Sequence, residues 1–179
     1  MEQPSDTILV AATPVAAMVR VTGRGTFKSG PALKQFGLSC IETGCSQIVI
    51  DLRDCVGMDS TFMGVLAGLS SALKKKNGGF LSAINLNAKN MALLDTLGLT
   101  AMIKTCGAGA ESDRIAAGIG TAPTQLDTSG ADKRTTTVTM LDAHETLVGV
   151  SSVNLPKFKN VLEYLRDDLK KQDQTAEKR

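Results

Sequence analysis

Two hydrophobic periods alternate along the first 106 residues, and this alternation constrains the fold more than any other feature of the sequence. Apolar residues at every second position, or in short β-branched runs, predict strands, and apolar residues three and four apart predict helices. Strands are expected at residues 7–10, 16–21, 47–52, 80–84 and 101–104. Helices are expected at residues 31–44, 60–76 and 87–98. Strands joined by helices over short connections imply an α/β sheet with helical crossovers.

The sequence changes in character near residue 107. Residues 107–134 are rich in Gly, Ala, Ser and Thr, which predicts a flexible linker with room for one loose turn at 114–117. Two amphipathic helices follow, with apolar stripes at 138–148 and 154–169, before a charged end that is expected to fray. Two helices cannot bury their stripes alone, so they dock on the α/β core, in a dimer or on a partner. The division expected is a domain at 1–106, a linker at 107–134 and a helical extension at 135–179.

Length and composition exclude several classes of protein. A chain of 179 residues with 42% apolar and 21% charged residues is typical of one globular core with a satellite element. The net charge of +2 and an aromatic content of 3% argue against a protein that binds nucleic acid. The apolar runs are shorter than the roughly 20 residues that span a bilayer. The acidic start, residues 1–6, is unlike a secretory signal, so we expect a soluble cytoplasmic protein without membrane insertion.

Neither a metal site nor a common enzyme motif is predicted. The cysteines are Cys40, Cys45, Cys55 and Cys106. They form no Cys-x-x-Cys pair, and the single histidine, His144, cannot complete a zinc site with them, so we expect reduced and mostly buried thiols. The glycines near Gly23 fit neither a P-loop nor a dinucleotide-binding pattern, and no serine lies in a Gly-x-Ser-x-Gly context. His144 is expected to be a packed residue, and the chain is predicted to be a non-enzymatic protein without a cofactor.

The strongest candidate site lies where the buried strand at 47–52 leads into the helix at 60–76. The connecting residues read Arg-Asp-Cys-Val-Gly-Met-Asp, and the helix starts with Ser-Thr. Ser60 is predicted to be the N-cap, because a hydroxyl oxygen there accepts a hydrogen bond from a backbone N–H one turn along. Asp59 adds negative charge at the positive end of the helix dipole. On spacing alone, a well-formed helix cap accounts for these residues.

The stretch IVIDLRDCVGMDSTFMGVL resembles the signature of the STAS domain family, the fold of bacterial anti-sigma-factor antagonists. The second strand with its terminal glycine at 19–23, the glycine-rich turn at 77–81 and the helix end at 93–99 are similar to the family as well. The resemblance covers residues 8–106. It implies a STAS-like mixed sheet with helical crossovers, to which two C-terminal amphipathic helices are added after the linker.

The resemblance also implies a function in signal transduction and transcription regulation. An unphosphorylated antagonist of this family binds an anti-sigma factor, which is a serine/threonine kinase, and thereby frees the sigma factor. Phosphorylation blocks this binding, and a serine/threonine phosphatase restores it. Thr61 matches the phosphoacceptor of the family, and Ser60 matches the hydroxyl before it. The residues expected at the partner interface are Met58, Asp59, Phe62, Met63 and Gly64.

Two departures from the family pattern leave alternatives open. Phe62 stands where members often have glycine, and it is either an exposed interface anchor or a side chain turned inward. The loop at 24–28 is basic, whereas many kinase-regulated members have an acidic residue there. The partner-switch hypothesis predicts an exposed Thr61 and a flat apolar surface around Phe62 and Met63.

Two other functions are compatible with the sequence. The first is an accessory subunit of an ABC-type or lipid transport assembly, which docks constitutively through the C-terminal helices without phosphorylation. The second is a small-molecule sensor or an enzyme, which would need a cavity lined by convergent polar groups that nothing in the sequence requires. The linker at 107–134 would also permit a homodimer in which the C-terminal helices are exchanged.

Overall fold

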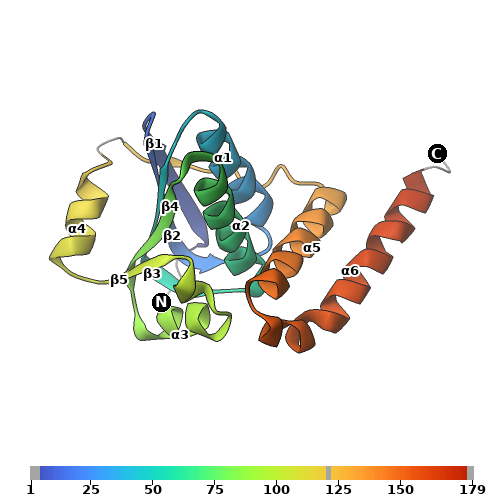
Figure 1. Cartoon of the computed structure of the whole chain (residues 1–179). Helices are drawn as coiled ribbons and strands as arrows, with labels where there is room; N and C mark the ends of the chain where they lie inside the picture. The colour runs from blue at the N-terminus through green and yellow to red at the C-terminus, as the bar shows by residue number, and fades with distance from the viewer. Residues whose placement is uncertain (1–4, 120–121, 177–179) are drawn as a thin grey trace.

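A six-stranded mixed sheet organises the protein (Figure 1), whose computed structural model describes residues 5–119 and 122–176. Its strands are β1 (Thr7–Ala12), β2 (Ala16–Gly25), β3 (Gln47–Met58), β4 (Phe80–Leu86), β5 (Lys104–Gly107) and β6 (Thr124–Gln125). They lie in the order β5-β4-β3-β2-β1-β6. Strands β2 to β5 are parallel, whereas β1 runs antiparallel to both β2 and β6. The predicted α/β sheet with helical crossovers is confirmed.

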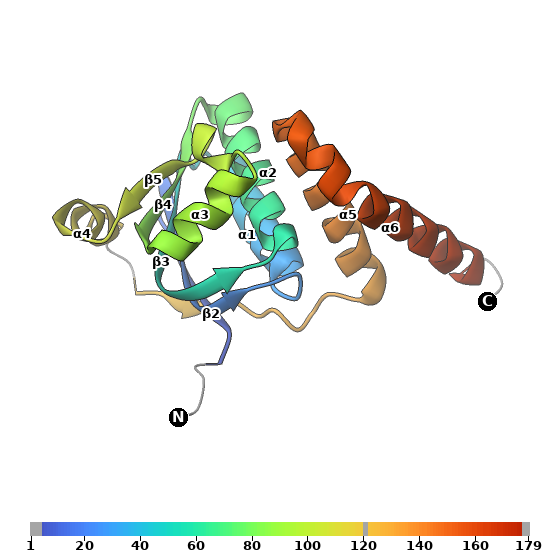
Figure 2. The ribbon, with the colours of Figure 1, turned by 90° about the horizontal axis from the view of Figure 1, so that it is seen from below.

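Helices cover both faces of this sheet. They are α1 (Gly30–Glu42), α2 (Ser60–Asn77), α3 (Ala88–Thr96), α4 (Ala110–Ala117), α5 (Lys133–Val150) and α6 (Leu155–Ala176), with 3-10 turns η1 (Leu99–Ala101) and η2 (Ser152–Asn154). Helices α1 and α2 lie on one face, and α4 lies on the other (Figure 1). The two C-terminal helices dock on the α/β core, because α5 packs on α2 and α6 packs on α5, with its far end pointing away from the body (Figure 2).

The main core lies between the sheet and helices α1 and α2. Alternate side chains of β3, such as Ile48 and Ile50, are fully buried there against Leu33 of α1 and Leu66 of α2. The side chains between them face the opposite side, where Val49 joins a smaller apolar cluster under α4. A sheet that is buried on both faces explains the nearly continuous apolar run of β3.

Several elements extend beyond the predicted limits. Strand β3 continues to Met58, where a loop was expected, because it keeps pairing with β2 through two register shifts that interrupt the alternating pattern. The last parallel strand begins only at Lys104, since residues 99–101 form a 3-10 turn. The segment at 107–134 contains α4 and β6 in addition to irregular backbone, and α6 continues through the charged end to Ala176. Residues 1–4 of the acidic start and residues 177–179 of the charged end lie outside the described residues.

Membrane spans, metal sites and the state of the cysteines can be examined in the described residues. Within them, no helix is both long and apolar enough to cross a bilayer. They also contain no group of three or more His, Cys, Asp or Glu side chains that could hold a metal ion. All four cysteines are free thiols, and three of them, Cys40, Cys45 and Cys55, are buried. Burial raises the pKa of each of these three thiols.

Candidate functional site

Asp59, rather than Ser60, caps the N-terminus of α2. Its Oδ1 accepts a hydrogen bond from the backbone N–H of Phe62 at 2.8 Å, and its backbone has the extended conformation typical of an N-cap. Its Oδ2 accepts from the N–H of Phe27 at 2.7 Å, and its own N–H donates to the carbonyl of Gly25. The predicted cap was one residue too late, because a carboxylate with two acceptor oxygens can serve the helix and the β2–α1 loop together. Asp59 therefore ties the end of β2 to the start of α2.

Ser60 is thereby left free to bond elsewhere, and it bonds to the only histidine of the chain. Its Oγ lies 2.9 Å from Nε2 of His144, which is on α5, and Nδ1 of His144 lies 2.7 Å from the carbonyl oxygen of Met140. A carbonyl can only accept, so Nδ1 carries a hydrogen and, in the neutral ring, Nε2 accepts from the Ser60 hydroxyl. His144 is 3% exposed, and its ring packs edge-on against Phe158 of α6. The expectation of a packed histidine is confirmed, but its hydrogen bond to Ser60 was missed.

Thr61 is buried, and the expectation that it is exposed is wrong in this structure. Its side chain is 3% exposed, whereas Ser60 before it is half-buried. A methyl group placed on Gly30 of α1 would lie 3.6 Å from Thr61 Cγ2 and 3.5 Å from Thr139 Cγ2. Thr61 and Thr139 of α5 are thus neighbours at the start of α1. Burial follows because both α1 and α5 approach the first turn of α2.

Phe62 is turned inward, which settles the first of the two open alternatives. It is fully buried, and a methyl group on Gly25 would lie only 2.6 Å from its ring carbon Cδ1. The ring therefore packs directly on the backbone at the end of β2, where a glycine makes the room. Met58 and Met63 are buried as well, at 6% and 4% exposure. The flat apolar surface expected around Phe62 and Met63 is therefore absent, because these side chains belong to the core.

Gly64 lies at a close approach between α2 and α5. A methyl group on Gly64 would lie 2.5 Å from the carbonyl oxygen of Ala143 and 2.7 Å from its Cβ. Ala143 and Leu147 of α5 are buried there and belong to the main core. The surface of α2 that carries the sequence-predicted site residues Ser60, Thr61 and Gly64 is therefore covered by α5. No local sequence pattern predicts this contact, since it depends on two small residues almost 80 positions apart.

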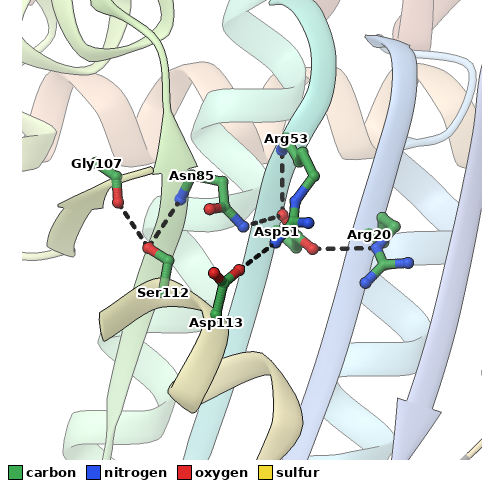
Figure 3. Close-up of polar contacts among 7 residues, drawn as sticks. All are labelled: Arg20, Asp51, Arg53, Asn85, Gly107, Ser112 and Asp113. Atoms are coloured by element: carbon green, nitrogen blue, oxygen red, sulfur yellow. Dashed lines mark hydrogen bonds and ion pairs between the residues drawn. The ribbon is translucent and has the colours of Figure 1, made fainter. Parts of the chain in front are cut away.

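A second polar cluster lies on the opposite face of the sheet, around Asp51 of β3 (Figure 3). Asp51 is fully buried, and its Oδ2 lies 3.0 Å from Nε of Arg20 on β2. Its Oδ1 accepts from the backbone N–H of Arg53 and from Nδ2 of Asn85, at 3.1 and 2.8 Å. A buried carboxylate is stable when its oxygens are paired in this way. Alternation along β2 and β3 places Arg20 and Asp51 on one face, so the sequence carried this signal.

Helix α4 completes the Asp51 cluster (Figure 3). The Oγ of Ser112 accepts a hydrogen bond from the backbone N–H of Asn85 and donates one to the carbonyl of Gly107. Asp113 pairs with Arg53 at 2.7 Å. Asn85 has a φ of 57°, which is uncommon for a residue other than glycine. The cluster therefore anchors α4 to the sheet, and its buried polar groups are occupied by one another.

Comparison with known families decides where this chain belongs. Residues 8–104, more than half of the chain, match the family described as "Mlab, STAS domain". The chain belongs to the STAS domain family. This finding agrees with the resemblance carried by the strand-to-helix segment at 48–66, and helices α5 and α6 lie outside the STAS match. No curated protein matches the chain.

Solved structures of STAS-like proteins agree with this assignment. An anti-sigma factor antagonist from Mycobacterium paratuberculosis has a TM-score of 0.53 and 21% identity, over 64% of this chain and 97% of that one. A putative anti-sigma factor antagonist, tm1081, from Thermotoga maritima has a TM-score of 0.52 and 17% identity, over 60% and 91%. The anti-sigma factor antagonist SpoIIAA in its unphosphorylated form has a TM-score of 0.50 and 17% identity, over 64% and 99%. These similarities establish the STAS fold.

Proposed function

We propose that this chain is a non-enzymatic protein-binding module that acts as an anti-sigma-factor antagonist in a phosphorylation-controlled partner switch in the bacterial cytoplasm. The placement of Ser60 carries the proposal. Its half-buried hydroxyl opens an 18-residue helix directly after the Asp59 cap, in a chain of the STAS family. The fold it shares with anti-sigma factor antagonists supports the same function. The proposed partners are an anti-sigma factor with serine/threonine kinase activity and a serine/threonine phosphatase.

Of the two candidate phosphoacceptors, Ser60 is favoured over Thr61. A kinase must bring the γ-phosphate in line with the hydroxyl oxygen, which requires an open approach to that oxygen. Ser60 is half-buried, whereas Thr61 is 3% exposed beneath α1 and α5. Displacement of α5 would free both hydroxyls, and Ser60 is the more exposed of the two before it. We therefore place the first phosphate on Ser60 and keep Thr61 as the second acceptor.

A phosphate at this position would change binding more than it changes the fold. It adds about 1.5 to 2 negative charges at pH 7. The N–H groups and the dipole at the start of α2 favour an anion, so the domain itself tolerates the group. A partner that docks over the start of α2 would have to desolvate this dianion beside the Asp59 carboxylate. Such burial of unpaired like charges costs several kcal/mol, on the order of what switches a protein interface off.

The mass of the intact chain purified from its native cells tests the proposal. We expect a species heavier by one phosphate that disappears after phosphatase treatment, with the phosphate mapped to Ser60. The Ser60→Ala variant should lose this species, and the matched Thr61→Ala variant should keep it. An unmodified chain under both growth and stress, in cells that contain the kinase, would contradict the partner switch.

The burial of Thr61 favours a second candidate function. An accessory subunit of a transport assembly needs no accessible phosphoacceptor and docks on its ATPase or permease constitutively. Under this alternative, a chain carrying Ser60→Ala and Thr61→Ala would bind the same partner as the unchanged chain. Under the partner switch, a Ser60→Glu variant would lose the anti-sigma factor, whereas Ser60→Ala would retain it.

A further inference from the structure

Three contacts hold α5 over the start of α2. The Ser60 hydroxyl is hydrogen-bonded to Nε2 of His144. Gly64 lies against the backbone of Ala143, and the methyl groups of Thr139 and Thr61 both face Gly30 at the start of α1. All three contacts involve the residues that the proposed function assigns to phosphorylation or to partner docking. A partner that approaches this surface therefore meets α5 before it meets α2.

Helices α5 and α6 form a unit that is tied together more by its own ion pairs than by ion pairs to the core. Lys133 pairs with Asp168 and Arg134 with Asp173, both between the two helices. Arg166 of α6 pairs with Glu145 of α5 in the same way. Leu162 and Leu165 of α6 are buried, and ring packing between Phe158 and His144 joins the helices further. We call this unit, residues 133–176, the C-terminal hairpin.

The hairpin contacts the rest of the chain through few polar groups. Lys34 of α1 pairs with Asp142, and the buried Asn154 donates to the carbonyl of Leu97. Lys157 donates to the carbonyl of Thr96 at the end of α3. Displacement of the hairpin would keep these internal ion pairs and would remove Ala143 and Leu147 from the main core. Residues 126–132, which contain Gly130, connect β6 to the hairpin without a helix or strand of their own.

The cover that α5 provides is incomplete. A cleft of about 220 Å³ remains between α1, α2 and α5, lined by Leu38, Val65 and Gly68 among others. A larger one, of about 900 Å³, opens between α1 and the start of α5. Leu38 is exposed beside both clefts. The two clefts lie beside the close contact of Gly64 with Ala143, and they reduce the packing that α5 would lose on leaving.

We propose that the α1–α2 surface is a docking surface for a helix, and that α5 of the same chain occupies it and excludes a partner until the hairpin is displaced. The inference rests on the proposed function, since it concerns the regulation of that same site. The partner it fits is a protein that presents an amphipathic helix with a small residue opposite Gly64. Tethering gives α5 an effective concentration on the order of millimolar, so a free partner helix competes only when it binds well or when the hairpin is weakened.

Phosphorylation of Ser60 and closure of the hairpin exclude one another. The phosphoester removes the hydroxyl hydrogen from Ser60 Oγ, which lies 2.9 Å from Nε2 of His144 in the closed structure. A kinase that modifies Ser60 therefore acts on the open chain, and the phosphate then keeps the hairpin from returning.

A cysteine reporter at the covered position tests the closure directly. In a Cys106→Ser background, we would introduce Thr61→Cys, which leaves the Ser60 bond to His144 intact, and measure the rate of maleimide labelling. Gly64→Ala should speed the labelling on the order of tenfold, because the added methyl meets the Ala143 backbone at 2.5 Å. The matched control is Gly68→Ala, one turn later on α2, where an added methyl meets nothing within 4 Å. Gly68→Ala should leave the rate unchanged.

Two labelling results would overturn the proposal that α5 covers the α1–α2 surface. Labelling of Thr61→Cys as fast as in the unfolded chain means that the surface is open in solution. Equal rates in the two alanine variants mean that α5 is not what protects it. If Gly64→Ala does not fold, His144→Ala serves as the opening variant, since it removes the bond to Ser60 without adding bulk.

A peptide of residues 133–150, the sequence of α5, tests whether the surface accepts a helix in trans. At about millimolar concentration it should slow the labelling of Thr61→Cys in the His144→Ala chain, and adding Gly64→Ala should abolish this protection. No protection in the His144→Ala chain would overturn the docking surface. A chain that is never phosphorylated but is labelled faster with Gly64→Ala than with Gly68→Ala would refute the partner switch and support the covering of the surface by α5. A chain that is phosphorylated but is labelled equally fast in both variants would support the partner switch and refute the covering by α5.

Discussion

At the scale of single residues, one glycine decides the orientation of the least expected side chain of the site. Phe62 follows the two candidate acceptors and would be an exposed apolar group if it pointed outward. The missing Cβ of Gly25 lets the ring lie flat on the end of β2 instead. The same strand end is held to α2 by Asp59. The start of α2 is thus positioned by one close apolar contact and one bidentate carboxylate.

Gly25→Ala should destabilise the protein by about 1–3 kcal/mol, because the new methyl would lie 2.6 Å from the Phe62 ring and the core would be overpacked. Chemical denaturation measures the change in the free energy of unfolding. The control is Gly57→Ala on β3, where the nearest group is the flexible end of Lys89 at 3.5 Å. A double variant with Phe62→Leu should recover part of the loss. Equal stability of the two alanine variants would contradict the close contact.

The thiols should differ sharply in reactivity. Burial raises the pKa of Cys40, Cys45 and Cys55, so little thiolate forms at neutral pH and reagents cannot reach it. Cys106 is partly exposed. Maleimide at pH 7 should therefore modify one thiol in the native chain and four after unfolding. Mass spectrometry counts the adducts, and fast modification of Cys55 in the folded chain would contradict its burial.

At the scale of elements, the sequence predicts a helix or strand well where the spacing of its apolar residues is regular, and poorly where that spacing is interrupted. Helix α2 was predicted to within about one residue of its end, because its apolar stripe, its lysines and Gly78 all agree. The second half of β3 was missed because two register shifts against β2 break the alternation. Helix α4 was predicted only as one loose turn at 114–117, because its short, Ala-rich sequence has little helix signal and the hydrogen bonds of Ser112 hold it in place.

Ser112→Ala should loosen α4 without unfolding the sheet. The substitution leaves the buried N–H of Asn85 without its acceptor, which costs about 1–3 kcal/mol. Amide hydrogen exchange of residues 110–117 should speed up accordingly, while exchange in β3 stays slow. Asp113→Ala is the matched control, because its ion pair with Arg53 is half exposed on both sides and is worth about 0–1 kcal/mol. Equal exchange in the two variants would refute the anchoring role of Ser112.

At the scale of the whole molecule, the site is made by two parts of the chain that the sequence describes separately. The STAS part supplies Asp59, Ser60 and Thr61, and its fold could be predicted from local periods and from one motif. The position of the C-terminal hairpin could not, since three dockings were compatible with its apolar stripes. The choice depends on the fit of Ala143 against Gly64 and on the hydrogen bond from Ser60 to His144. Contacts of this kind have no periodic signature.

Acid should weaken the C-terminal hairpin through its own carboxylates. The N–H and the side chain of Thr135 hold the pKa of Asp132 below the usual 3.8, and the side chain of Gln172, followed by Lys133, does the same for the pKa of Asp168. A lowered pKa in the folded state stabilises the fold fully above about pH 3.8, and this contribution disappears as the pH falls through the lowered values. Between pH 5 and pH 2, roughly, NMR signals of residues 133–176 should therefore broaden or shift at lower urea than those of β3 and β4.

Asp168→Asn tests the assignment of this acid response. The variant removes the charge but not the shape, so the hairpin should be weaker at pH 6 and its stability should depend less on pH between 5 and 2. Asp167→Asn, whose exposed carboxylate pairs with Lys170 at 3.6 Å, is the matched control and should behave like the unchanged chain. If both variants keep the full pH dependence, the carboxylate of Asp168 does not hold the hairpin. The acid response would then originate in the core, and hairpin and sheet would unfold as one cooperative unit.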